Sequence, residues 1–565
     1  MRDFILQCRR QLFYAGLFSG CVNLLLLTAS FYMLQVFDRV FSSRSLETLL
    51  MLTLAALVAL LVMMALDILR TRLLLASGLI LDQALGPRVL RGLLNAASEG
   101  GDTDYAMGMR DVAVVRSFLS GSGIVALFDA PWVPIYLAVI FLFHPLLGWL
   151  AVLFAAVLFA VACGNEKLTR PPTEEMQRRA RLASRYVDGG VRNAEVIRAL
   201  GMLERVSGLW QTLNRDVLES QAGVGRVSGV IGGLSRFIRQ AVQVLMMATG
   251  AYLVIHQDMT SGGMIAITII LSRALAPVEQ AIGSWKGFID FRASYRRLDE
   301  MLRKNSESGD LLQLPPPAGL VQVEKLVVVR DRIQILKGLT FAVTAGEVVG
   351  IIGPSGAGKS TLLRALAGVW RPAAGNVRLD GADLSEWPRE YLGQFVGYLP
   401  QDVELFPGTV AENIARFSEA ADDSVVDAAK RAGAHEMILR LAKGYNTQIG
   451  EGGNHLSAGQ RQRVGLTRAM FGSPKLMILD EPNANLDAEG EIALLQAITL
   501  LKQAACTVIL VSHKPSIMAG ADKLLVLRDG RVELFGPRQE VLIQLAPLAT
   551  RPRPDEGSSP QTQSS

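Results

Sequence analysis

One stretch decides the fold of the second half of this chain: Gly353-Pro354-Ser355-Gly356-Ala357-Gly358-Lys359-Ser360. An apolar run from Val348 to Ile352 precedes it, and a helical pattern from Ser360 to Leu366 follows it. A strand, a glycine-rich loop and a helix in this order are the context in which the G-x-x-x-x-G-K-S pattern forms a phosphate-binding loop. The stretch therefore predicts an α/β domain that binds a nucleotide.

The residue types of this loop suit contact with phosphate. Glycines let the backbone amides wrap the β- and γ-phosphates, and the ammonium group of Lys359 adds a positive charge there. The hydroxyl of Ser360 is a ligand for the Mg2+ that accompanies the nucleotide. We therefore predict that all eight loop residues and the following Thr361 bind the nucleotide, and that Ser360 also binds Mg2+.

A second segment, Leu476-Met477-Ile478-Leu479-Asp480-Glu481, is an apolar strand that ends in two carboxylates. Mg2+ prefers oxygen ligands, often through water, which suits Asp480. The adjacent Glu481 is then placed to polarise the attacking water as a general base. Two solvated acids at a strand end are the alternative, which the apolar character of the strand disfavours.

The composition of the whole chain indicates a membrane protein with more than one domain. The 565 residues are 50% hydrophobic and their mean hydropathy is +0.31, which is too apolar for an ordinary soluble enzyme. The formal net charge of +5 is small and the basic residues are scattered, which disfavours nucleic-acid binding. The four cysteines lie far apart without a C-x-x-C pair, so we expect neither a zinc site nor a disulfide framework.

Six segments are long and apolar enough to be membrane-spanning helices of about 20 residues. They cover residues 14–36, 48–66, 124–142, 145–163, 237–255 and 262–283. The first resembles a secretory signal, but it is too long and lacks a cleavage site, so we interpret it as a retained span. The loops after the second and fourth spans are long and rich in arginine, which places both termini in the cytosol. We therefore expect an all-α polytopic membrane domain over residues 1–290.

Charged residues interrupt the last two spans at Arg239, Arg273 and Glu279. A charge in the middle of a bilayer costs about 2.5–3.5 kcal/mol, so these side chains would face a wet interior or other helices. The alternative is that they lie near the ends of the spans and extend to the membrane surface. Two of these residues, Arg273 and Glu279, are together with Asp129 candidates for lining a polar path.

Beyond the spans the chain changes character. It becomes charged after residue 290, and Leu314-Pro315-Pro316-Pro317 interrupts any helix, so we assign a linker to residues 291–319. The α/β domain with the phosphate-binding loop then covers residues 320–546. Residues 547–565 are rich in Pro, Ser and Gln, and we expect a disordered tail there because such a composition cannot bury a core.

Between the loop and the Asp480-Glu481 pair lies Leu456-Ser457-Ala458-Gly459-Gln460, followed by an arginine-rich helix. With these three motifs the chain resembles the ATP-binding-cassette family, whose signature reads Leu-Ser-Gly-Gly-Gln. Ala458 replaces the first glycine and adds one methyl group where the family lets a phosphate approach closely. The resemblance implies an ATPase with ATP and Mg2+ as cofactors.

The resemblance assigns roles to further residues. Gln401, in Leu399-Pro400-Gln401, matches a residue that binds Mg2+ and couples the nucleotide to the membrane domain. His513 matches a catalytic residue that contacts the γ-phosphate beside Glu481, and Asp487 lies in a segment that communicates across a dimer. In the family an aromatic residue upstream of the loop stacks on adenine, and Arg330 stands in the matching stretch here, where its guanidinium can cover the base.

The signature also implies a second copy of the chain. In the family, the signature of one subunit closes on the ATP that is held by the phosphate-binding loop of another. Ser457, Gly459 and Gln460 are therefore expected to bind the nucleotide of a partner. One cassette in each chain implies a homodimer with two composite ATP sites.

The membrane half narrows the resemblance to exporters. Residues 447–453 match a loop found before the signature in exporters, and residues 31–40 and 128–136 resemble motifs of type I protein-secretion exporters of the PrtD type. For the second of these motifs the alternative is that Pro131 and Pro134 simply end a span. The resemblance predicts six spans of the type IV exporter fold before the ATPase domain. A lipid or small-molecule exporter of the same fold is the alternative function.

The same resemblance predicts the surroundings of the protein. It implies the bacterial inner membrane as the location, with the ATPase domain in the cytosol. The expected cargo is an unfolded polypeptide with a carboxy-terminal secretion signal. The expected partners are a periplasmic adaptor (membrane fusion) protein and a TolC-like outer-membrane channel.

Overall fold

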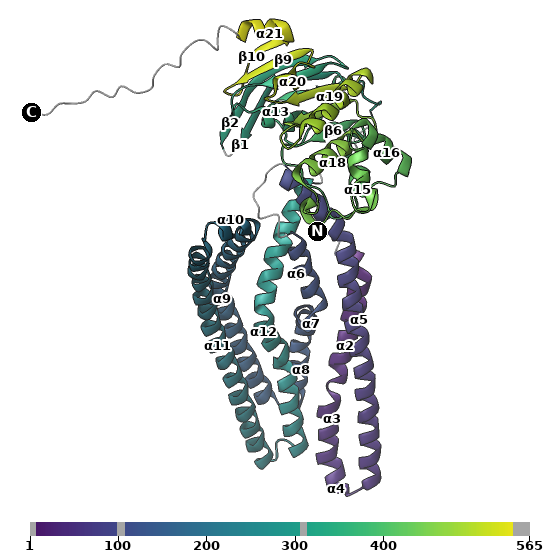
Figure 1. Ribbon diagram of the computed structural model, residues 1–565. Coiled ribbons are helices and arrows are strands. Elements are labelled where there is room, and N and C mark those ends of the chain that lie inside the picture. The colour runs from purple at the N-terminus through teal and green to yellow at the C-terminus, as the bar shows by residue number, and fades with distance from the viewer. Residues whose placement is uncertain (1–6, 99–107, 306–313, 331, 546–565) are drawn as a thin grey trace, which may run out of the picture. The chain divides into compact units, whose positions relative to one another are not determined.

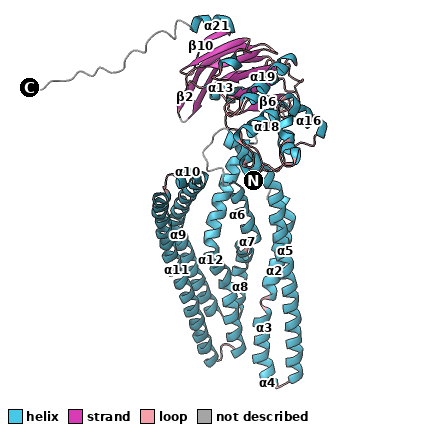
Figure 2. Cartoon of the chain, in the orientation of Figure 1, coloured by secondary structure: helices cyan, strands magenta, loops and turns pink. Residues whose placement is uncertain are grey.

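The computed structural model describes residues 7–98, 108–305, 314–330 and 332–545. The chain divides into two compact units, one before residues 306–313 and one after them. The first unit is helical, and the second combines strands and helices (Figure 1, Figure 2). The fold class expected from the sequence, an all-α membrane domain followed by an α/β nucleotide-binding domain, is confirmed.

The first unit consists of long helices joined by short connections. Its elements are α2 (Arg9–Leu25), α3 (Thr28–Gln35), the π-helix η1 (Val36–Val40), α4 (Phe41–Ser43), α5 (Leu46–Ser98), α6 (Gly108–Ser120), α7 (Ser122–Asp129), the 3-10 turn η3 (Ala130–Trp132), α8 (Val133–Phe143), α9 (Pro145–Arg192), α10 (Ala194–Ala199), α11 (Leu203–Ile255) and α12 (Ser261–Asn305). Among the described residues, six helical stretches are long and apolar enough to cross a membrane, and each overlaps one of the six expected spans. Helix α12 packs against α3, α6, α7, α8, α9 and α11.

The helix that contains the two prolines of the 128–136 motif does not end at them. The chain passes from α7 through the 3-10 turn η3 into α8, with Pro131 and Pro134 in the first turns of η3 and α8. A proline is tolerated there because the first amides of a helix have no partner within it. The interpretation of this motif as the end of a span is therefore wrong. The span ends at His144, whose extended backbone joins α8 to α9.

Asp129, from the same motif, lies in a polar cluster between four helices. It accepts a hydrogen bond from Asn23 on α2 at 2.6 Å and another from the hydroxyl of Ser19. The guanidinium of Arg70 on α5 lies 3.7 Å away, and the hydroxyl of Tyr136 on α8 donates to Asn23 at 3.0 Å. The carboxylate thus holds the first, second and third spans together, as expected for polar groups removed from water.

Two of the three charges in the last two spans, Arg239 and Glu279, are paired with each other. Arg239 on α11 and Glu279 on α12 form an ion pair of 3.1 Å, which favours helix partners over extension to the membrane surface. Arg273 is exposed on α12.

The linker begins later than the sequence indicates, because α12 continues to Asn305. Two features stabilise the helix in a segment that is rich in charged residues. Leu298 and Met301 are buried on one face, and Asp299 and Arg303 form an ion pair of 3.0 Å at the favourable i, i+4 spacing. Assigning residues 291–305 to a linker is therefore wrong. The expected disordered tail, 547–565, lies outside the described residues.

The second unit contains two sheets with helices around them. Its elements are β1 (Val321–Arg330), β2 (Ile333–Val343), β3 (Val348–Ile352), α13 (Lys359–Leu366), β4 (Ala374–Leu379), β5 (Ala382–Asp383), α14 (Arg389–Leu392), β6 (Val396–Leu399), α15 (Val410–Ile414), α16 (Asp422–Arg431), α17 (His435–Leu439), η4 (Gly444–Asn446), η5 (Glu451–Gly453), α18 (Ala458–Met470), β7 (Leu476–Asp480), α19 (Ala488–Gln503), β8 (Thr507–Val511), α20 (Pro515–Met518), β9 (Lys523–Arg528), β10 (Arg531–Pro537) and α21 (Arg538–Leu545). The smaller sheet is antiparallel, in the order β2-β1-β4-β5.

The larger sheet has the order β10-β9-β3-β8-β7-β6 and is parallel except for the edge strand β10. Its central strands are continuous apolar runs, because helices cover both faces of a parallel sheet. Strands β7 and β8 are buried over their whole length. The register pairs Val349 of β3 with Ile509 of β8, and Leu479 of β7 with Leu510 of β8, so the carboxyl ends of these strands lie at one edge.

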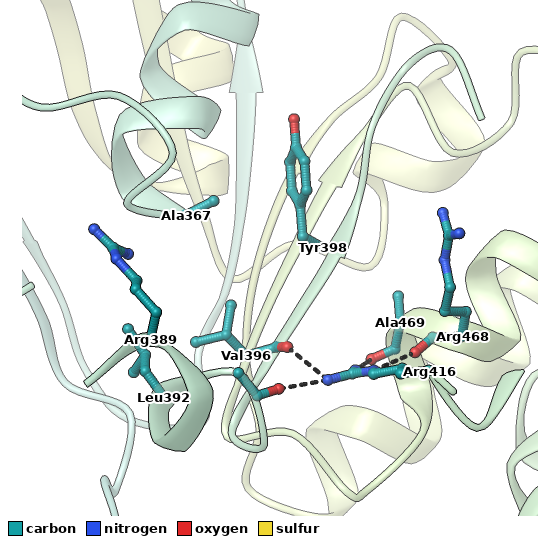
Figure 3. Close-up of a pocket in the computed structure, with 9 residues that line it drawn as sticks. Ala367, Arg389, Leu392, Val396, Tyr398, Arg416, Arg468 and Ala469 are labelled. Atoms are coloured by element: carbon teal, nitrogen blue, oxygen red, sulfur yellow. Dashed lines mark hydrogen bonds between the residues drawn. The ribbon is translucent and has the colours of Figure 1, made fainter. Parts of the chain in front are cut away.

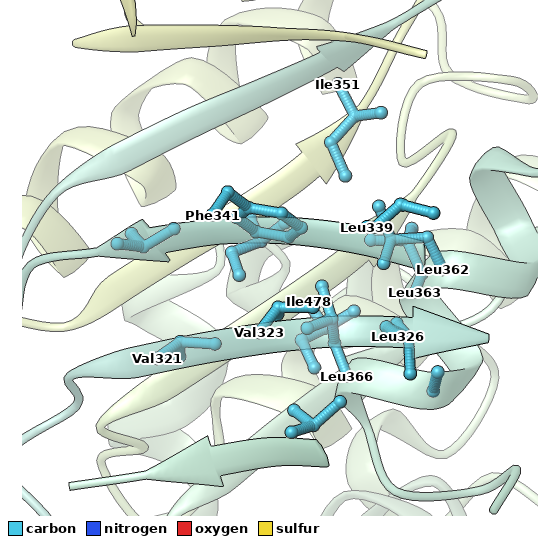
Figure 4. Packing of buried hydrophobic residues seen from close by; sticks show 14 of the residues in the cluster. Val321, Val323, Leu326, Leu339, Phe341, Ile351, Leu362, Leu363, Leu366 and Ile478 are labelled. Carbon is cyan, nitrogen blue, oxygen red and sulfur yellow. The ribbon is translucent and has the colours of Figure 1, made fainter. Parts of the chain in front are cut away.

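One hydrophobic core joins the two sheets through helix α13. Leu362, Leu363 and Leu366 of this helix pack with Leu326 and Leu339 of the antiparallel sheet (Figure 4). Ile351 of β3 and Ile478 of β7 belong to the same core. The helix that follows the phosphate-binding loop is therefore fixed on both sides, and the loop inherits this rigid position.

Candidate nucleotide site

Four neighbouring strands deliver the predicted site residues to one edge of the larger sheet. The phosphate-binding loop follows β3, His513 follows β8, Asp480 ends β7 with Glu481 directly after it, and Gln401 follows β6. In open α/β sheets ligands bind outside the carboxyl ends of the parallel strands. Residues that are up to 160 positions apart in the sequence, Gly353 and His513, therefore share one site.

The loop from Gly353 to Gly358 is closely packed against the rest of the domain. A side chain at Gly353 would place its Cβ atom 2.1 Å from the carbonyl oxygen of Leu527, and its φ of +155° also favours glycine. Pro354, Ser355 and Gly356 are exposed, whereas Ala357 and Thr361 are buried. The exposed side of the loop is thus the side that a phosphate can reach.

Lys359 lies inside this loop, with only 8% of its surface exposed. Its ammonium group donates to the carbonyl oxygens of Gly353 at 2.8 Å and Pro354 at 3.0 Å. Burial lowers the pKa of Lys359, and the carboxylates of Glu481 and Asp480 act in the opposite direction. A buried ammonium group of this kind gains from any anion placed at the loop, because phosphate oxygens replace neutral carbonyls as acceptors.

Asp480 and Ser360 provide the donor set that a hard divalent cation prefers. Asp480 is 1% exposed, burial raises its pKa, and a hydrogen bond from the hydroxyl of Ser360 opposes this rise. The Oδ1 atom of Asp480 is buried and has no hydrogen-bond partner among the described residues. A buried carboxylate oxygen without a partner is costly, and a cation such as Mg2+ would satisfy it. The residues therefore fit Mg2+.

Two other candidate residues, Gln401 and His513, contact the carboxylate of Glu481. Its Oε2 atom accepts a hydrogen bond from the side-chain amide of Gln401 at 3.1 Å, and its Oε1 atom lies 3.5 Å from Nε2 of His513. The backbone of Glu481 is left-handed, with φ of +48°, and its amide donates to the carbonyl of Val511 at 3.0 Å. This strained conformation turns the carboxylate out of the strand and toward the strand ends of β6 and β8.

The signature residues begin helix α18. Ser457 is its N-cap and forms a capping box with Gln460, because each side chain accepts from the backbone amide of the other. Ala458 is exposed, so its methyl group meets no clash within the described residues. A Cβ atom at Gly459 would lie 2.8 Å from the carbonyl of Asn485. The glycine therefore allows the signature to pack against the segment before Asp487.

Helix α18 is tied to Asp487 by a residue that the sequence analysis did not single out. The largely buried guanidinium of Arg463 lies 3.3 Å from Asp487 and 3.5 Å from Glu489. Asp487 is the N-cap of α19, and the hydrogen bond from the amide of Gly490 lowers its pKa. Nothing in the sequence marks Arg463 for this role, because the helix contains several arginines.

The structure does not bring the signature to the phosphate-binding loop of the same chain. Within the described part of the chain no hydrogen bond or ion pair links Ser457, Gly459 or Gln460 to residues 353–361. The exposed amides at the start of α18 are left to a ligand or a partner outside the chain.

Arg330, the candidate for contact with adenine, stacks on a tryptophan. Its guanidinium carbon lies 4.6 Å from the ring centroid of Trp370, and that of Arg364 lies 5.0 Å from the same ring. Trp370 comes after α13 rather than upstream of the loop, so a search for an upstream aromatic residue misses it. The contact of Arg330 with adenine stays a prediction.

A pocket of about 260 Å3 lies beside the strand that leads to Gln401 (Figure 3). One of its walls is Arg416, whose backbone is left-handed. The guanidinium of Arg416 donates to the carbonyls of Arg468 and Ala469 at 3.0 Å, to that of Val396 at 3.5 Å and to that of Gly393. Arg416 therefore joins the carboxyl end of the signature helix α18 to β6, the strand before Gln401.

Comparison with known proteins gives the same division of the chain. The family model described as "ABC transporter transmembrane region" matches residues 12–277, and the one described as "ABC transporter" matches residues 336–484. The chain is 43% identical to the type I secretion system ATP-binding protein PrsD of Rhizobium meliloti, over 95% of this chain and 93% of that protein. It is 30% identical to the toxin RTX-I translocation ATP-binding protein of Actinobacillus pleuropneumoniae, over 92% and 74%.

The fold has a counterpart among solved structures. A bacterial Atm1-family ABC exporter with ATP bound superposes with a TM-score of 0.80 over 97% of this chain and 99% of that one. The two sequences are 23% identical, so the likeness concerns the fold.

Proposed function

Since the chain belongs to the ATP-binding-cassette exporters of type I secretion systems, we propose that it moves unfolded polypeptides with a carboxy-terminal secretion signal across the bacterial inner membrane. The protein is a multi-pass inner-membrane ATPase whose nucleotide-binding domain lies in the cytosol, and ATP hydrolysis drives export. The similarity to PrsD over almost the full length of both chains carries this proposal. We propose an unfolded cargo because an unfolded chain needs a much narrower passage than a folded domain.

Hydrolysis of ATP follows from the proposed roles of the strand-end residues. The backbone amides of residues 353–358, except that of Pro354, which has no N-H, and the ammonium group of Lys359 hold the phosphates. Mg2+, bound through Ser360, Asp480 and Gln401, would neutralise charge on the phosphate oxygens. Glu481 accepts the proton of the attacking water, and His513 donates a hydrogen bond to the γ-phosphate. The 3.1 Å bond from Gln401 and the 3.5 Å approach of His513 support a carboxylate held in position for this task.

The active form in this proposal is a homodimer. Ser457, Gly459 and Gln460 of one chain would complete the site formed by Lys359 of the other. The separation of these two groups within one chain supports the proposal, since the amides at the start of α18 otherwise have no anion to bind. ATP then holds the two ATPase domains together, and hydrolysis releases them.

Arg416 gives this cycle a route from α18 to Gln401 within the ATPase domain. When α18 shifts against a partner's nucleotide, Arg416 would transmit the shift from Arg468 and Ala469 of α18 to Val396 of β6, the strand before Gln401.

The proposed partners beyond the dimer are a periplasmic adaptor protein and a TolC-like outer-membrane channel. Homologues in type I secretion systems imply partner proteins and a secreted substrate, and the two named classes are the finer part of the proposal.

A reconstituted system tests the cargo class. The full-length protein in liposomes receives a peptide that carries the secretion signal of a protein encoded beside it, with and without the adaptor. We expect the peptide to change the ATPase rate, and a scrambled peptide to have no effect. A rate that ignores the signal in every adaptor condition, together with stimulation by lipids and lipid flipping, would overturn protein export in favour of a lipid exporter.

A further inference from the structure

We infer that the first unit binds the phosphate group of an anionic membrane lipid in a pocket between α9 and α12, at the cytosolic surface of the membrane. The pocket has a volume of about 70 Å3. Helix α9 contributes Glu166, Arg170 and Glu174 to its lining, and α12 contributes Trp285, Phe288, Ile289, Arg292, Ala293 and Arg296.

The position of the pocket along both helices matches the lipid headgroups. Glu166 follows the end of the fourth expected span, at Cys163, by three residues, and Trp285 follows the end of the sixth, at Gly283, by two. At 1.5 Å per residue these are about 5 and 3 Å beyond the hydrocarbon. The headgroup layer on each side of a bilayer is about 5–8 Å thick. The upper part of the pocket therefore lies at headgroup depth.

The arginines of the lower part are long enough to extend back toward the membrane. Helix α12 runs from the outer side to the cytosol, and side chains on a helix tilt toward its N-terminus. Arg292 and Arg296 are four residues apart on one face of α12, and both line the pocket. Long basic side chains commonly extend to the membrane surface in this way.

The charged side chains that line the pocket have one positive charge in excess, which one anion would balance. Arg170 is paired with Glu174 at 2.9 Å. Arg292 and Arg296 make no hydrogen bond or ion pair to any residue that the structure describes, and Glu166 is the one further carboxylate in the lining. The lining therefore carries a net charge of +1, from three arginines and two glutamates. A phosphodiester with a single negative charge balances it.

Trp285 adds a donor and an aromatic surface. Its indole Nε1 atom is buried and has no hydrogen-bond partner among the described residues. The ring lies 5.3 Å from that of Phe288. Tryptophan is enriched at headgroup depth because its ring prefers the apolar side and its N-H prefers a polar acceptor, and a phosphate oxygen supplies that acceptor.

The size of the pocket favours a lipid phosphate over a segment of cargo. A volume of 70 Å3 has room for a few water molecules, which suits a phosphate group but not a stretch of polypeptide. Basic pockets between membrane helices on the cytosolic side are typical sites for anionic headgroups.

The test uses the full-length protein in nanodiscs that contain phosphatidylglycerol, phosphatidylethanolamine and phosphatidylcholine in equal amounts. After release into detergent, native mass spectrometry counts the lipids that stay bound. We expect retention of phosphatidylglycerol over the other two, and about a tenfold weaker retention in R292Q/R296Q. Trp285→Phe, which keeps the ring and removes the donor, should show an intermediate loss.

The matched control is R205Q/R215Q, which removes two exposed arginines from α11 and should leave retention unchanged. Gel filtration and the basal ATPase rate show that each variant is folded, since none of these residues belongs to the nucleotide site. Equal retention of the three lipids, or equal retention by the wild type and R292Q/R296Q, would overturn the proposal. So would a loss of the response to a secretion-signal peptide in R292Q/R296Q without any change in lipid binding, which would assign the pocket to cargo.

Discussion

The carboxylate of Asp38 accepts a hydrogen bond of 3.0 Å from the backbone amide of Gly262. Asp38 lies in the π-helix η1 at the end of the first span, and Gly262 lies in the first turn of α12. A second bond of 2.8 Å comes from the hydroxyl of Thr260. Because the first amides of a helix have no partner within it and carry partial positive charge, an aspartate from another helix is stabilising there. This contact joins the outer ends of the first and sixth spans, and it explains why the 31–40 motif contains an aspartate.

Gly262→Ala should destabilise the protein, because the added Cβ atom would lie 2.5 Å from a carboxylate oxygen of Asp38 and 2.8 Å from the carbonyl of Leu34. We expect a loss of about 1–3 kcal/mol, seen as a lower midpoint of thermal unfolding in detergent. The matched control is Gly229→Ala on α11, where a Cβ atom meets nothing within 4 Å. There the same change should leave the midpoint unchanged or raise it. Equal midpoints for the two variants would contradict the proposed contact.

Glu481→Gln should keep ATP binding and lower the ATPase rate by about 10²–10⁴-fold. The amide is nearly the same size as the carboxylate and its oxygen can still accept from Gln401, but it cannot take a proton from water. Phosphate release measures the rate, and a fluorescent ATP analogue measures binding. Turnover at the wild-type rate would rule out Glu481 as the general base.

Lys359→Ala should weaken ATP binding itself by about 10- to 100-fold, since a hydrogen bond to a charged group contributes about 1.5–3 kcal/mol. Equilibrium binding of ATP to the purified protein measures the change. Lys443→Ala removes an exposed lysine outside the site and serves as the control. If both variants bound ATP as the wild type does, the role of Lys359 would have to be abandoned.

The affinity for Mg2+ in the presence of ATP should fall as the pH is lowered. Burial raises the pKa of Asp480 above its ordinary value of 3.8, so protons compete with Mg2+ for the carboxylate at a higher pH than for an exposed aspartate. Titration of the ATPase rate with Mg2+ between about pH 8 and 5.5 measures the shift. Asp480→Asn should bind Mg2+ weakly at every pH, and a pH dependence that survives in this variant would assign it to another group.

Swapping Arg239 and Glu279 for each other should be tolerated better than changing either residue alone. Arg239→Glu alone, or Glu279→Arg alone, puts two like charges together in the spans, and a charge without a partner there costs about 2.5–3.5 kcal/mol. The double variant restores an ion pair with reversed direction. We expect low yield of folded protein for each single variant and recovery for the double one, measured by fluorescence size-exclusion chromatography. Three equally stable variants would indicate that the pair contributes nothing.

Much of the nucleotide site could be predicted from the sequence because its motifs are local. The phosphate-binding loop and the Asp480-Glu481 pair each lie at the end of one apolar strand. A few consecutive residues are therefore enough to recognise the strand and the motif that follows it. Arg463 and Trp370 could not be predicted in the same way. Their partners are Asp487 and Arg330, which reach them only through the packing of separate elements.

The membrane half shows the same limit. Hydropathy indicated six spans, since a bilayer requires long apolar helices whatever their neighbours are. It did not indicate that α12 continues to Asn305, because the buried face at Leu298 and Met301 is short and surrounded by charges. The tolerance of Pro131 and Pro134 within the third span likewise depends on their place in the turns η3 and α8.

The sequence by itself therefore determined the fold class, the family and the candidate residues for a nucleotide site, because these depend on local patterns that neighbouring residues set. Only the tertiary structure decided which distant polar groups meet: Asp129 with Asn23 and Arg70, Glu279 with Arg239, and Asp38 with Gly262. The physical reason is that a buried or membrane-embedded charge needs a partner, but any of several polar residues can satisfy it. The packing of the helices makes the choice.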